Sequence, residues 1–232
     1  ASLVPMTVPT GLVACQTIFG LMAKNAMIFS PHPRTKKVTN FVVNDLRELL
    51  DRMGYPKDLL QCVENPSLRM TDILMKKADF VIATGGAAMV KAAYSSGTPA
   101  FGVGAGNSIS YVDDSADLEN TARGIRNAEM NDWGSGCSTE NSVVIHAAVY
   151  DKMIDALKKE GGYLCNAEEK EKLINVLWKN GKLNVDCIIH TPQHIAKTAG
   201  FQVPDACTFL MAEETHWGEA YPMTEEKLSP VI

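Results

Sequence analysis

Short apolar runs alternate with longer segments of helical periodicity over residues 1–130. The runs have the length of buried strands, and the predicted strands cover residues 1–5, 26–29, 59–63, 80–83 and a glycine-interrupted stretch over 100–112. Between them, apolar residues recur at helical spacing, and the predicted helices cover residues 12–24, 38–53, 72–75, 87–94 and 118–130. Such alternation is typical of an α/β fold in which helices cover both faces of a parallel sheet.

A second, less regular α/β part begins at residue 131. Its predicted strands cover residues 142–146, 185–189 and 207–212, and its predicted helices cover residues 149–159, 167–180 and 192–199. Thr10 and Asn166 are expected to cap the helices that follow them, and Gly200 is expected to end the last helix. We therefore predict two domains, 1–130 and 131–232. Both ends of the chain fall inside a domain, as expected of a partial chain.

Composition and charge narrow the function classes. Hydrophobic residues make up 46% of the 232 residues and charged residues 21%, which is ordinary for a globular protein. A formal net charge of −5 argues against a protein that binds nucleic acid through bulk charge. No apolar run approaches the ~20 residues of a membrane span. Neither nucleic acid nor a membrane is therefore an expected partner, and the expected location is cytoplasmic.

The cysteines and histidines do not predict a metal site. Six cysteines are present, without a CxxC pair or other metal-ligand spacing. The simplest interpretation is six free thiols in a reducing compartment. His190 and His194 are four residues apart, but Pro192 between them favours the start of a helix over a shared metal ion. We expect no metal ion in this chain.

Four loops follow predicted strands of the first part and contain Gly, Pro, Ser, Thr or Arg, at residues 6–10, 30–34, 84–86 and 102–107. In parallel sheets, ligands bind at the carboxyl ends of the strands, so these loops suit a nucleotide. The G-x-G-x-x-G fingerprint is absent, because Asn107 follows Gly102-Val-Gly104-Ala-Gly106 where a third glycine should stand. Tight turns explain these glycines equally well.

The stretch Asn131–Asn141 places one cysteine, Cys137, behind two glycines and before a polar Ser-Thr-Glu-Asn run. Glycine lets backbone N–H groups come close to a substrate, and such groups stabilise the oxyanion of a tetrahedral intermediate. Cys137 is therefore a candidate nucleophile. The competing interpretation is a small apolar residue in a turn.

Several motifs together resemble the CoA-acylating aldehyde dehydrogenases. They are Phe29-Ser-Pro-His-Pro-Arg34, Ala83-Thr-Gly-Gly86, Met89-Val-Lys-Ala-Ala-Tyr-Ser-Ser-Gly97, Gly102-Val-Gly-Ala-Gly-Asn107, Cys137 with its flanks, and Glu226-Lys-Leu-Ser-Pro-Val231. This family includes acetaldehyde, propionaldehyde and sulfoacetaldehyde dehydrogenases and the aldehyde half of bifunctional aldehyde–alcohol dehydrogenases. The resemblance implies an aldehyde dehydrogenase-like fold. Residues 1–130 would form a Rossmann-like domain that binds NAD and coenzyme A, N-terminally incomplete, and residues 131–232 a C-terminally incomplete catalytic domain.

The resemblance also implies an activity and a set of site residues. The enzyme would convert a short aldehyde, NAD (with NADP as the alternative) and coenzyme A to acyl-CoA and NADH, through a thioester on Cys137. The implied cofactor residues are Ser30 and Arg34 near the adenosine ribose and phosphates, Thr84, Gly85 and Gly86 on the pyrophosphate and nicotinamide side, and Glu226 on the nicotinamide ribose. Gly104 is a further expected cofactor-binding residue. Family members form homo-oligomers, and some lie within bacterial microcompartments.

Two departures from family patterns bear on the reaction. Hydrolytic aldehyde dehydrogenases carry a glutamate where this chain has Phe101-Gly-Val-Gly104, so we expect a thiol rather than water as acyl acceptor. Val8 stands where the family has an asparagine whose amide completes the oxyanion hole. Losing one such donor lowers the rate by about 10²–10³-fold. Val8 favours a first alternative, a catalytically inactive fragment that serves as a binding or assembly module. The absent glutamate disfavours the second alternative, a hydrolytic enzyme.

Overall fold

The computed structural model describes residues 1–218 and 220–232, and its contacts divide the chain into two compact units, Ala1–Ala105 and Gly106–Ile232. The sequence places the boundary near residue 130 instead. Residues 106–130 belong to the second unit because β6 (Ser108–Val112) pairs with β7 (Glu140–Ile145), and α5 (Leu118–Met130) packs against α6 (Tyr150–Lys159). The predicted glycine-interrupted strand is consequently two strands, one in each unit.

The first unit is built on a five-stranded sheet in the order β3-β2-β1-β4-β5, and every neighbouring pair is parallel. Its strands are β1 (Ser2–Val4), β2 (Met27–Pro31), β3 (Leu60–Cys62), β4 (Val81–Thr84) and β5 (Ala100–Val103). Its helices are α1 (Gly11–Met22), α2 (Lys36–Arg52), α3 (Leu68–Lys77) and α4 (Ala87–Tyr94), with 3-10 turns η1 (Pro33–Thr35) and η2 (Lys57–Leu59). The predicted α/β fold with a parallel sheet is confirmed.

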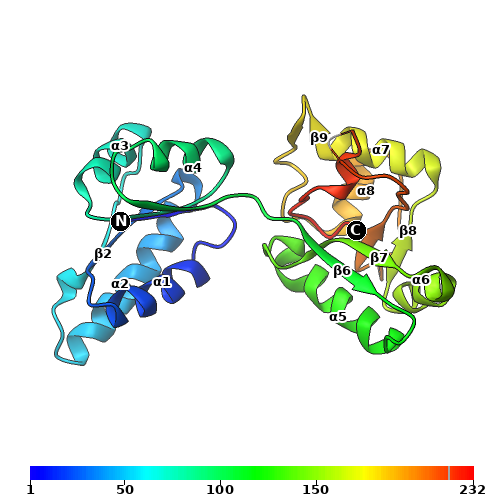
Figure 1. Ribbon diagram of the computed structural model, residues 1–232, viewed down its shortest axis with the longest axis horizontal. Helices are drawn as coiled ribbons and strands as arrows, with labels where there is room; N and C mark the ends of the chain where they lie inside the picture. Colours follow the sequence, from blue (N-terminus) through cyan, green and yellow to red (C-terminus); the bar gives the residue numbers. More distant parts are fainter. Residues whose placement is uncertain (219) are drawn as a thin grey trace. The chain divides into compact units, whose positions relative to one another are not determined.

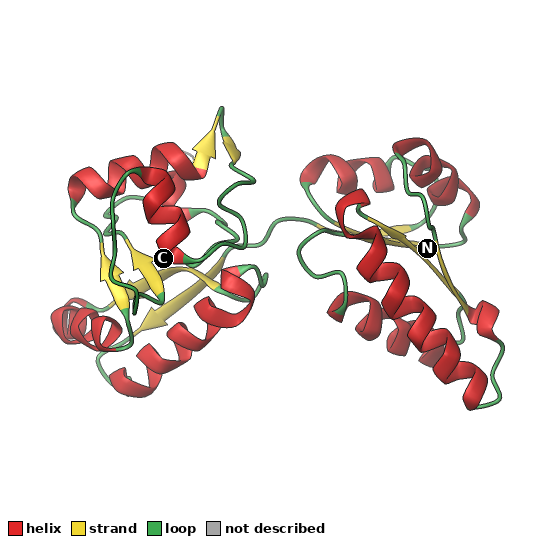
Figure 2. Ribbon diagram, turned by 180° about the vertical axis from the view of Figure 1, so that it is seen from behind, coloured by secondary structure: helices red, strands yellow, loops and turns green. Residues whose placement is uncertain are grey.

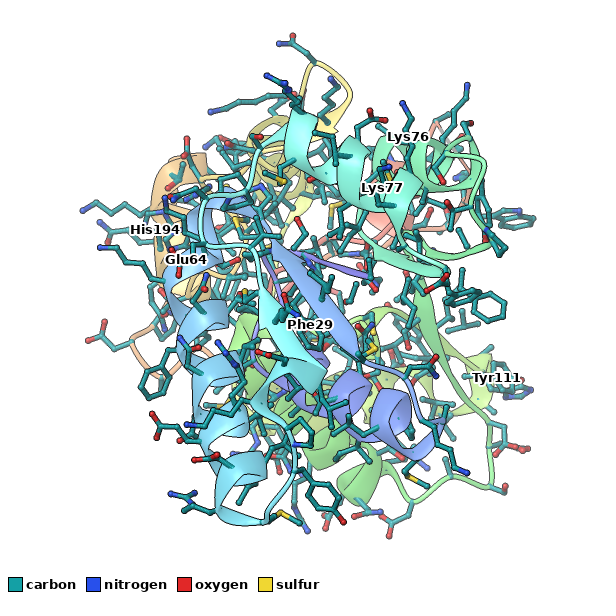
Figure 3. The ribbon with its side chains drawn as sticks, turned by 90° about the vertical axis from the view of Figure 1, so that its left-hand side faces the viewer. Phe29, Glu64, Lys76, Lys77, Tyr111 and His194 are labelled. Carbon is teal, nitrogen blue, oxygen red and sulfur yellow. The ribbon has the colours of Figure 1, made fainter. Side chains whose placement is uncertain are left out.

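Helices cover both faces of this sheet, with α1 and α2 on one side and α3 and α4 on the other (Figure 1). Successive residues of β1 point to opposite faces. Val4 packs in the same core cluster as Phe29, whereas Leu3 packs with Val81. Figure 3 shows Phe29 on β2, where its ring is fully buried. Strands buried on both faces form continuous apolar runs, which explains why the sequence pattern predicts them.

The edge strand β5 explains one glycine of the motif at residues 102–106. Its Phe101 and Val103 side chains are more than half exposed, at 66% and 51%. Gly102 between them faces α4, where an added Cβ would lie 2.3 Å from Val90 Cγ1 and 2.7 Å from Tyr94 Cε2. Only glycine fits at this position, since the strand and the helix approach each other too closely for a side chain.

In the described part of the second unit, the strands form three two-stranded sheets. β6 and β7 are parallel, β8 (Gly162–Leu164) and β11 (Phe209–Met211) are parallel, and β9 (Trp178–Lys179) and β10 (Lys182–Leu183) are antiparallel. The remaining elements are α7 (Ala167–Leu177), α8 (Pro192–Ala199) and 3-10 turns η3 (Asn131–Gly134), η4 (Ala147–Val149) and η5 (Pro222–Thr224). Figure 2 shows helices lying around these short strands.

Two apolar clusters form the core of the second unit. The first joins α5 and α6 to β6 and β11 through Val112, Ile125, Met153, Leu157 and Phe209. The second joins α7 and α8 to β11 through Leu173, Leu177, Ile195 and Leu210. The outer face of β6 is not part of either cluster: Tyr111 is 64% exposed and projects away from the ribbon (Figure 3).

Two predicted elements of the second unit are wrong. Residues 185–189 form turns rather than a strand, and the helix predicted over 167–180 ends at Leu177. The β9–β10 hairpin follows, and its turn residues Asn180 and Gly181 both have positive φ, at 54° and 69°. Asn-Gly is the strongest short signal for such a hairpin, so the sequence contained the information.

The predicted helix caps divide between the units. Asn166 caps α7, because its Oδ1 accepts from the Glu169 N–H at 2.9 Å while Glu169 Oε2 accepts from the Asn166 N–H at 2.9 Å. Gly200 ends α8 with a φ of 86°, as predicted. Thr10 precedes α1 without a side-chain capping bond, so that predicted cap is wrong. None of the described helices is both long enough and apolar enough to cross a membrane.

Candidate functional site

The Cys137 loop, defined as residues 131–139, joins α5 to β7. Three successive residues have positive φ, namely Asp132 (48°), Trp133 (52°) and Gly134 (70°). These residues form a left-handed turn after α5. A second turn follows, in which the Thr139 N–H donates to the Gly136 carbonyl at 3.0 Å. Cys137 lies within this turn and is exposed, so the loop presents its thiol at the surface of the unit.

The two glycines before Cys137 have different physical reasons. Gly134 has positive φ and also faces the backbone of Ser229 and Pro230, where an added Cβ would lie 2.6 Å from the Ser229 carbonyl carbon. Gly136 faces a side chain only, since its Cβ would lie 3.1 Å from Thr139 Oγ1. Gly134 therefore allows a segment distant in sequence to pack directly against the Cys137 loop.

Gly106 connects two residues of the predicted site. An added Cβ at Gly106 would lie 3.8 Å from the Cys137 carbonyl oxygen. Glu226 is half-buried, and burial raises the pKa of its carboxyl, an effect that the Gly106 backbone N–H partly offsets. The structure therefore brings Cys137 and Glu226 together around Gly106. Asn107, the residue before β6, connects this part of the chain to η5, because its Nδ2 donates to the Thr224 carbonyl at 2.7 Å.

Two fully buried ionisable side chains flank this arrangement, and the sequence did not predict either. The ammonium of Lys227 donates to the carbonyl oxygens of Asn141, Met223 and Glu225. Burial lowers the pKa of Lys227 to about 8, although the nearby carboxylates of Glu129 and Glu225 oppose this shift. Burial raises the pKa of Glu129 to about 9, against the attraction of Lys227. Lysine and glutamate are rarely buried, so no sequence signal identified them.

In the first unit, the predicted cofactor residues lie at the carboxyl ends of the parallel strands. Ser30 and Arg34 lie at the carboxyl end of β2, Thr84 to Gly86 at that of β4, and Gly104 beyond that of β5. All three strands are parallel members of the same sheet. This end of the strands is where α/β sheets bind nucleotides.

The individual positions differ from the expectation in one respect. Ser30 lies inside β2 and is 4% exposed, whereas the sequence places it in a loop. Arg34 is exposed in η1, and the exposed Gly86 directly precedes α4, whose first turn has no side-chain cap. An added Cβ at Gly104 would meet nothing within 4 Å, so packing does not require glycine there. The cofactor roles of these residues stay predictions.

The two histidines singled out by spacing form a stacked pair. Their ring centroids lie 4.1 Å apart, and His194 Nε2 lies 3.1 Å from the Asp186 carbonyl oxygen. Pro192 begins α8, with the Thr191 side chain accepting from the His194 N–H. Among the described residues, no group of three His, Cys, Asp or Glu side chains could hold a metal ion.

Comparison with known proteins decides the family. A family model described as the aldehyde dehydrogenase family matches residues 1–165, which is well over half of the chain. The chain belongs to the aldehyde dehydrogenase family. Sulfoacetaldehyde dehydrogenase from an Acholeplasma species is 40% identical and covers 100% of this chain. The acylating sulfoacetaldehyde dehydrogenase of Bilophila wadsworthia is also 40% identical over 100% of it. These relatives confirm the predicted acylating branch.

Solved structures agree with this family assignment. The acetylating aldehyde dehydrogenase of Geobacillus thermoglucosidasius matches this aldehyde dehydrogenase chain with a TM-score of 0.96 and 38% identity, over 100% of this chain. The propionaldehyde dehydrogenase of Rhodopseudomonas palustris, solved with bound CoA and an acylated cysteine, matches with a TM-score of 0.89 and 30% identity over 99% of this chain. The predicted aldehyde dehydrogenase fold is confirmed.

This aldehyde dehydrogenase chain spans about half the length of the relatives it matches. It covers 49% of the Acholeplasma protein, 51% of the Bilophila protein and 52% of the Geobacillus structure. Against the bifunctional aldehyde–alcohol dehydrogenase of Escherichia coli, 39% identical, it covers 26% of the relative.

Proposed function

We propose that this chain provides the nucleophilic cysteine and the nucleotide-binding sheet of an NAD-dependent, CoA-acylating oxidation of a short aldehyde. The observation that carries the proposal is Cys137, exposed on a loop whose backbone depends on Gly134. Its strongest outside support is the similar Rhodopseudomonas palustris propionaldehyde dehydrogenase, whose structure contains CoA and an acylated cysteine.

The Cys137 thiolate would attack the aldehyde carbonyl and form a thiohemiacetal. The N–H of Cys137 would donate to the oxyanion, because backbone donors at a glycine-flanked turn approach the reacting oxygen closely. NAD, when bound, supplies the acceptor for the hydride that the thiohemiacetal carbon must lose to become a thioester. Cys137 would then hold the acyl group as a thioester until the thiol of coenzyme A displaces it as acyl-CoA.

The first unit suits a nucleotide at the carboxyl edge of its sheet. The exposed Arg34 supplies a cation for phosphate, and the uncapped first turn of α4 supplies backbone N–H donors after Gly86. Glu226 of the second unit would accept from the hydroxyls of the nicotinamide ribose. The family resemblance is the basis for these proposed roles.

The acyl acceptor is proposed to be a thiol rather than water. Hydrolysis needs a base that activates water, and residues 101–104 contain no carboxylate at the place where hydrolytic members carry one. The similar acylating sulfoacetaldehyde dehydrogenases of Bilophila wadsworthia and Cupriavidus necator also support a thiol as the acyl acceptor. The aldehyde itself is proposed only as short, since the similar proteins are named for aldehydes with a sulfonate group, with a carboxylate group, or with neither.

One observation favours a second candidate, an inactive member of the same fold that serves as a binding or assembly module. Val8 offers no amide where the family resemblance expects one, so the oxyanion would lack its side-chain donor. That loss alone lowers the rate by about 10²–10³-fold. In Val8→Asn, the proposed enzyme should gain activity by a similar factor, whereas an inactive module should gain none.

The test is NADH formation from acetaldehyde, propionaldehyde and sulfoacetaldehyde, with and without coenzyme A. Cys137→Ala should abolish it, because no thioester can form. Cys15→Ala is the matched control, since Cys15 is also an exposed thiol but lies on α1 of the other unit. Release of free acid without coenzyme A would contradict the acylating reaction. Equal loss of activity in both variants would contradict Cys137 as the nucleophile.

A further inference from the structure

The buried Lys227 is not used by the proposed reaction, yet its position suggests a role in it. Its side chain is 0% exposed, although an ammonium is costly to remove from water. An apolar side chain of similar volume would fill the same space without that cost. Stability alone therefore does not explain a lysine here, and its hydrogen bonds indicate what the charge does.

Lys227 joins two segments that are far apart in sequence. Its Nζ donates to the Asn141 carbonyl at 2.5 Å, and its own backbone N–H donates to Asn141 Oδ1 at 2.8 Å. The same Nζ donates to the carbonyls of Met223 and Glu225, at 2.8 and 3.1 Å. One ammonium thus ties the start of β7 to the segment 223–230. Hydrogen bonds from a charged donor are the stronger kind.

The segment 223–230 touches the Cys137 loop on its other flank as well. The backbone of Ser229 and Pro230 packs against Gly134, which precedes Cys137, while Asn141 follows it. Farther along, the chain is fixed to β11, because the Leu210 N–H donates to the Pro230 carbonyl at 2.9 Å. The segment 223–230 therefore contacts the chain on both sides of Cys137, at Gly134 and at Asn141. Lys227 makes the contact at Asn141.

The same segment carries Glu226, the residue next to Lys227. Gly106 lies beside both Glu226 and the Cys137 carbonyl. A shift of the segment would consequently move the Glu226 carboxyl and the Cys137 loop at the same time. Catalytic groups held even 1 Å from their productive position lose much of their rate.

We propose that Lys227 is a positioning residue, whose ammonium fixes the segment 223–230 against β7 and thereby sets the place of both Cys137 and Glu226. The proposal rests on the proposed function for its effect on turnover. Its structural part, the hold on the Cys137 loop, is independent of that function and can be measured without substrate.

The test compares Lys227→Met with the parent chain by hydrogen–deuterium exchange and by steady-state kinetics. Methionine is unbranched and only one atom shorter than lysine, but it cannot donate a hydrogen bond. We expect the amides of residues 131–139 and 223–230 to exchange about 10- to 100-fold faster, the factor typical of losing a bond from a charged donor. We expect kcat to fall by at least about 10-fold and the KM for aldehyde to change by less than about 3-fold.

The matched control is Lys170→Met, on α7 of the same unit. Lys170 also donates to a backbone carbonyl, that of Glu213, and pairs with Glu214 at 2.9 Å, but it does not contact the segment 223–230 through these bonds. This control should leave kcat and the exchange of residues 131–139 unchanged. Faster exchange throughout the second unit of Lys227→Met, α7 included, would overturn the proposal in favour of a general loss of stability.

Asn141→Ala is a milder second variant, should Lys227→Met fail to fold. It removes the Oδ1 acceptor and leaves the ammonium in place, so the same two segments should exchange faster, by a smaller factor. Unchanged exchange of residues 131–139 in the folded variants would overturn the proposal, as would unchanged kcat despite faster exchange. If the parent chain forms no NADH, the proposed function fails, and the exchange measurement alone decides whether Lys227 holds the loop.

Discussion

The sheet of the first unit and the Cys137 loop of the second are held in place by opposite means. In the sheet, apolar side chains from neighbouring elements meet in two clusters, one on each face. Around the loop, buried polar groups come from distant parts of the chain, such as Lys227 and Asn141, which are 86 positions apart. Apolar packing is non-directional and tolerant, whereas buried polar contacts fix one geometry at a cost in stability.

The cost is visible in the side chains that surround the loop. Buried oxygen atoms of Glu129, Ser135, Glu140 and Ser229 have no hydrogen-bond partner among the described residues. All four residues lie in the Cys137 loop, within two positions of it, or in the segment 223–230. Such groups weaken a fold by about 1–3 kcal/mol each. Mutations in the sheet should therefore lower the free energy of unfolding by an amount that depends on the side-chain volume removed. Mutations around the loop should change it by an amount that depends on backbone geometry or on pH.

The largest effect is expected in the sheet, from Phe29→Ala. Phe29 is 0% exposed, so removing its ring should lower the free energy of unfolding of the first unit by about 3–5 kcal/mol. Phe41→Ala is the control, since Phe41 is 71% exposed on α2 and should cost less than about 0.5 kcal/mol. Urea unfolding followed by circular dichroism measures both. Similar losses would show that this face of the sheet is not a packed core.

Gly134→Ala tests the geometry of the loop. Alanine there adds strain at a φ of 70° and places a Cβ against the backbone of Ser229 and Pro230, so we expect a loss of about 2–3 kcal/mol. Gly181→Ala has a similar φ of 69° but open space around it, and should cost about 1 kcal/mol. Thermal unfolding compares the two. Equal losses would mean that the segment 223–230 moves aside freely.

Glu129→Gln should remove a pH dependence. Because burial raises the pKa of Glu129 from 4.5 to about 9, the unfolded chain loses this proton first. The free energy of unfolding should therefore fall as pH rises from about 5, by roughly 1 kcal/mol per pH unit. The lowered pKa of Lys227, about 8, acts in the opposite direction above pH 8 and cancels the fall there.

The neutral glutamine cannot titrate, so the decline between about pH 5 and 8 should flatten in Glu129→Gln. Urea midpoints at several pH values measure this. The exposed Glu119, in the first turn of the same helix, provides the control Glu119→Gln, which should keep the parent's slope. A parent chain whose stability does not fall over this range would contradict a protonated, buried Glu129.

The same contrast explains what the sequence could predict. Strands such as β4 and helices such as α4 follow from local apolar runs and helical spacing, and their predicted positions agree with the structure to within a residue. The grouping of residues 106–130 with the second unit depends on the pairing of β6 with β7, which no local pattern contains. Boundaries between units are set by such distant contacts.

For the candidate site, the sequence predicts Cys137 from its glycines and Glu226 from a family motif. It did not reveal that Gly106 lies beside both, nor that Lys227 is buried, because a lysine in a polar stretch ordinarily predicts an exposed side chain. Spacing alone cannot show where a side chain separated by many residues will lie. The residues proposed to react were thus easier to predict from the sequence than the buried residues beside them.

The smallest change in the free energy of unfolding is expected at the helix N-caps, where one helix of each unit can be compared. Asn166 and Glu169 form a reciprocal pair of capping bonds at α7, so Asn166→Ala should lower the free energy of unfolding by about 1 kcal/mol. Thr10 makes no such bond at α1, so Thr10→Ala should change it by less than about 0.5 kcal/mol. Urea unfolding at one pH compares them.

Because both residues precede a helix and are ordinary N-cap types, the sequence alone predicts equal effects. A loss confined to Asn166→Ala would show that the polar contacts of the second unit stabilise it even at its surface, and equal losses would contradict the observed difference in capping.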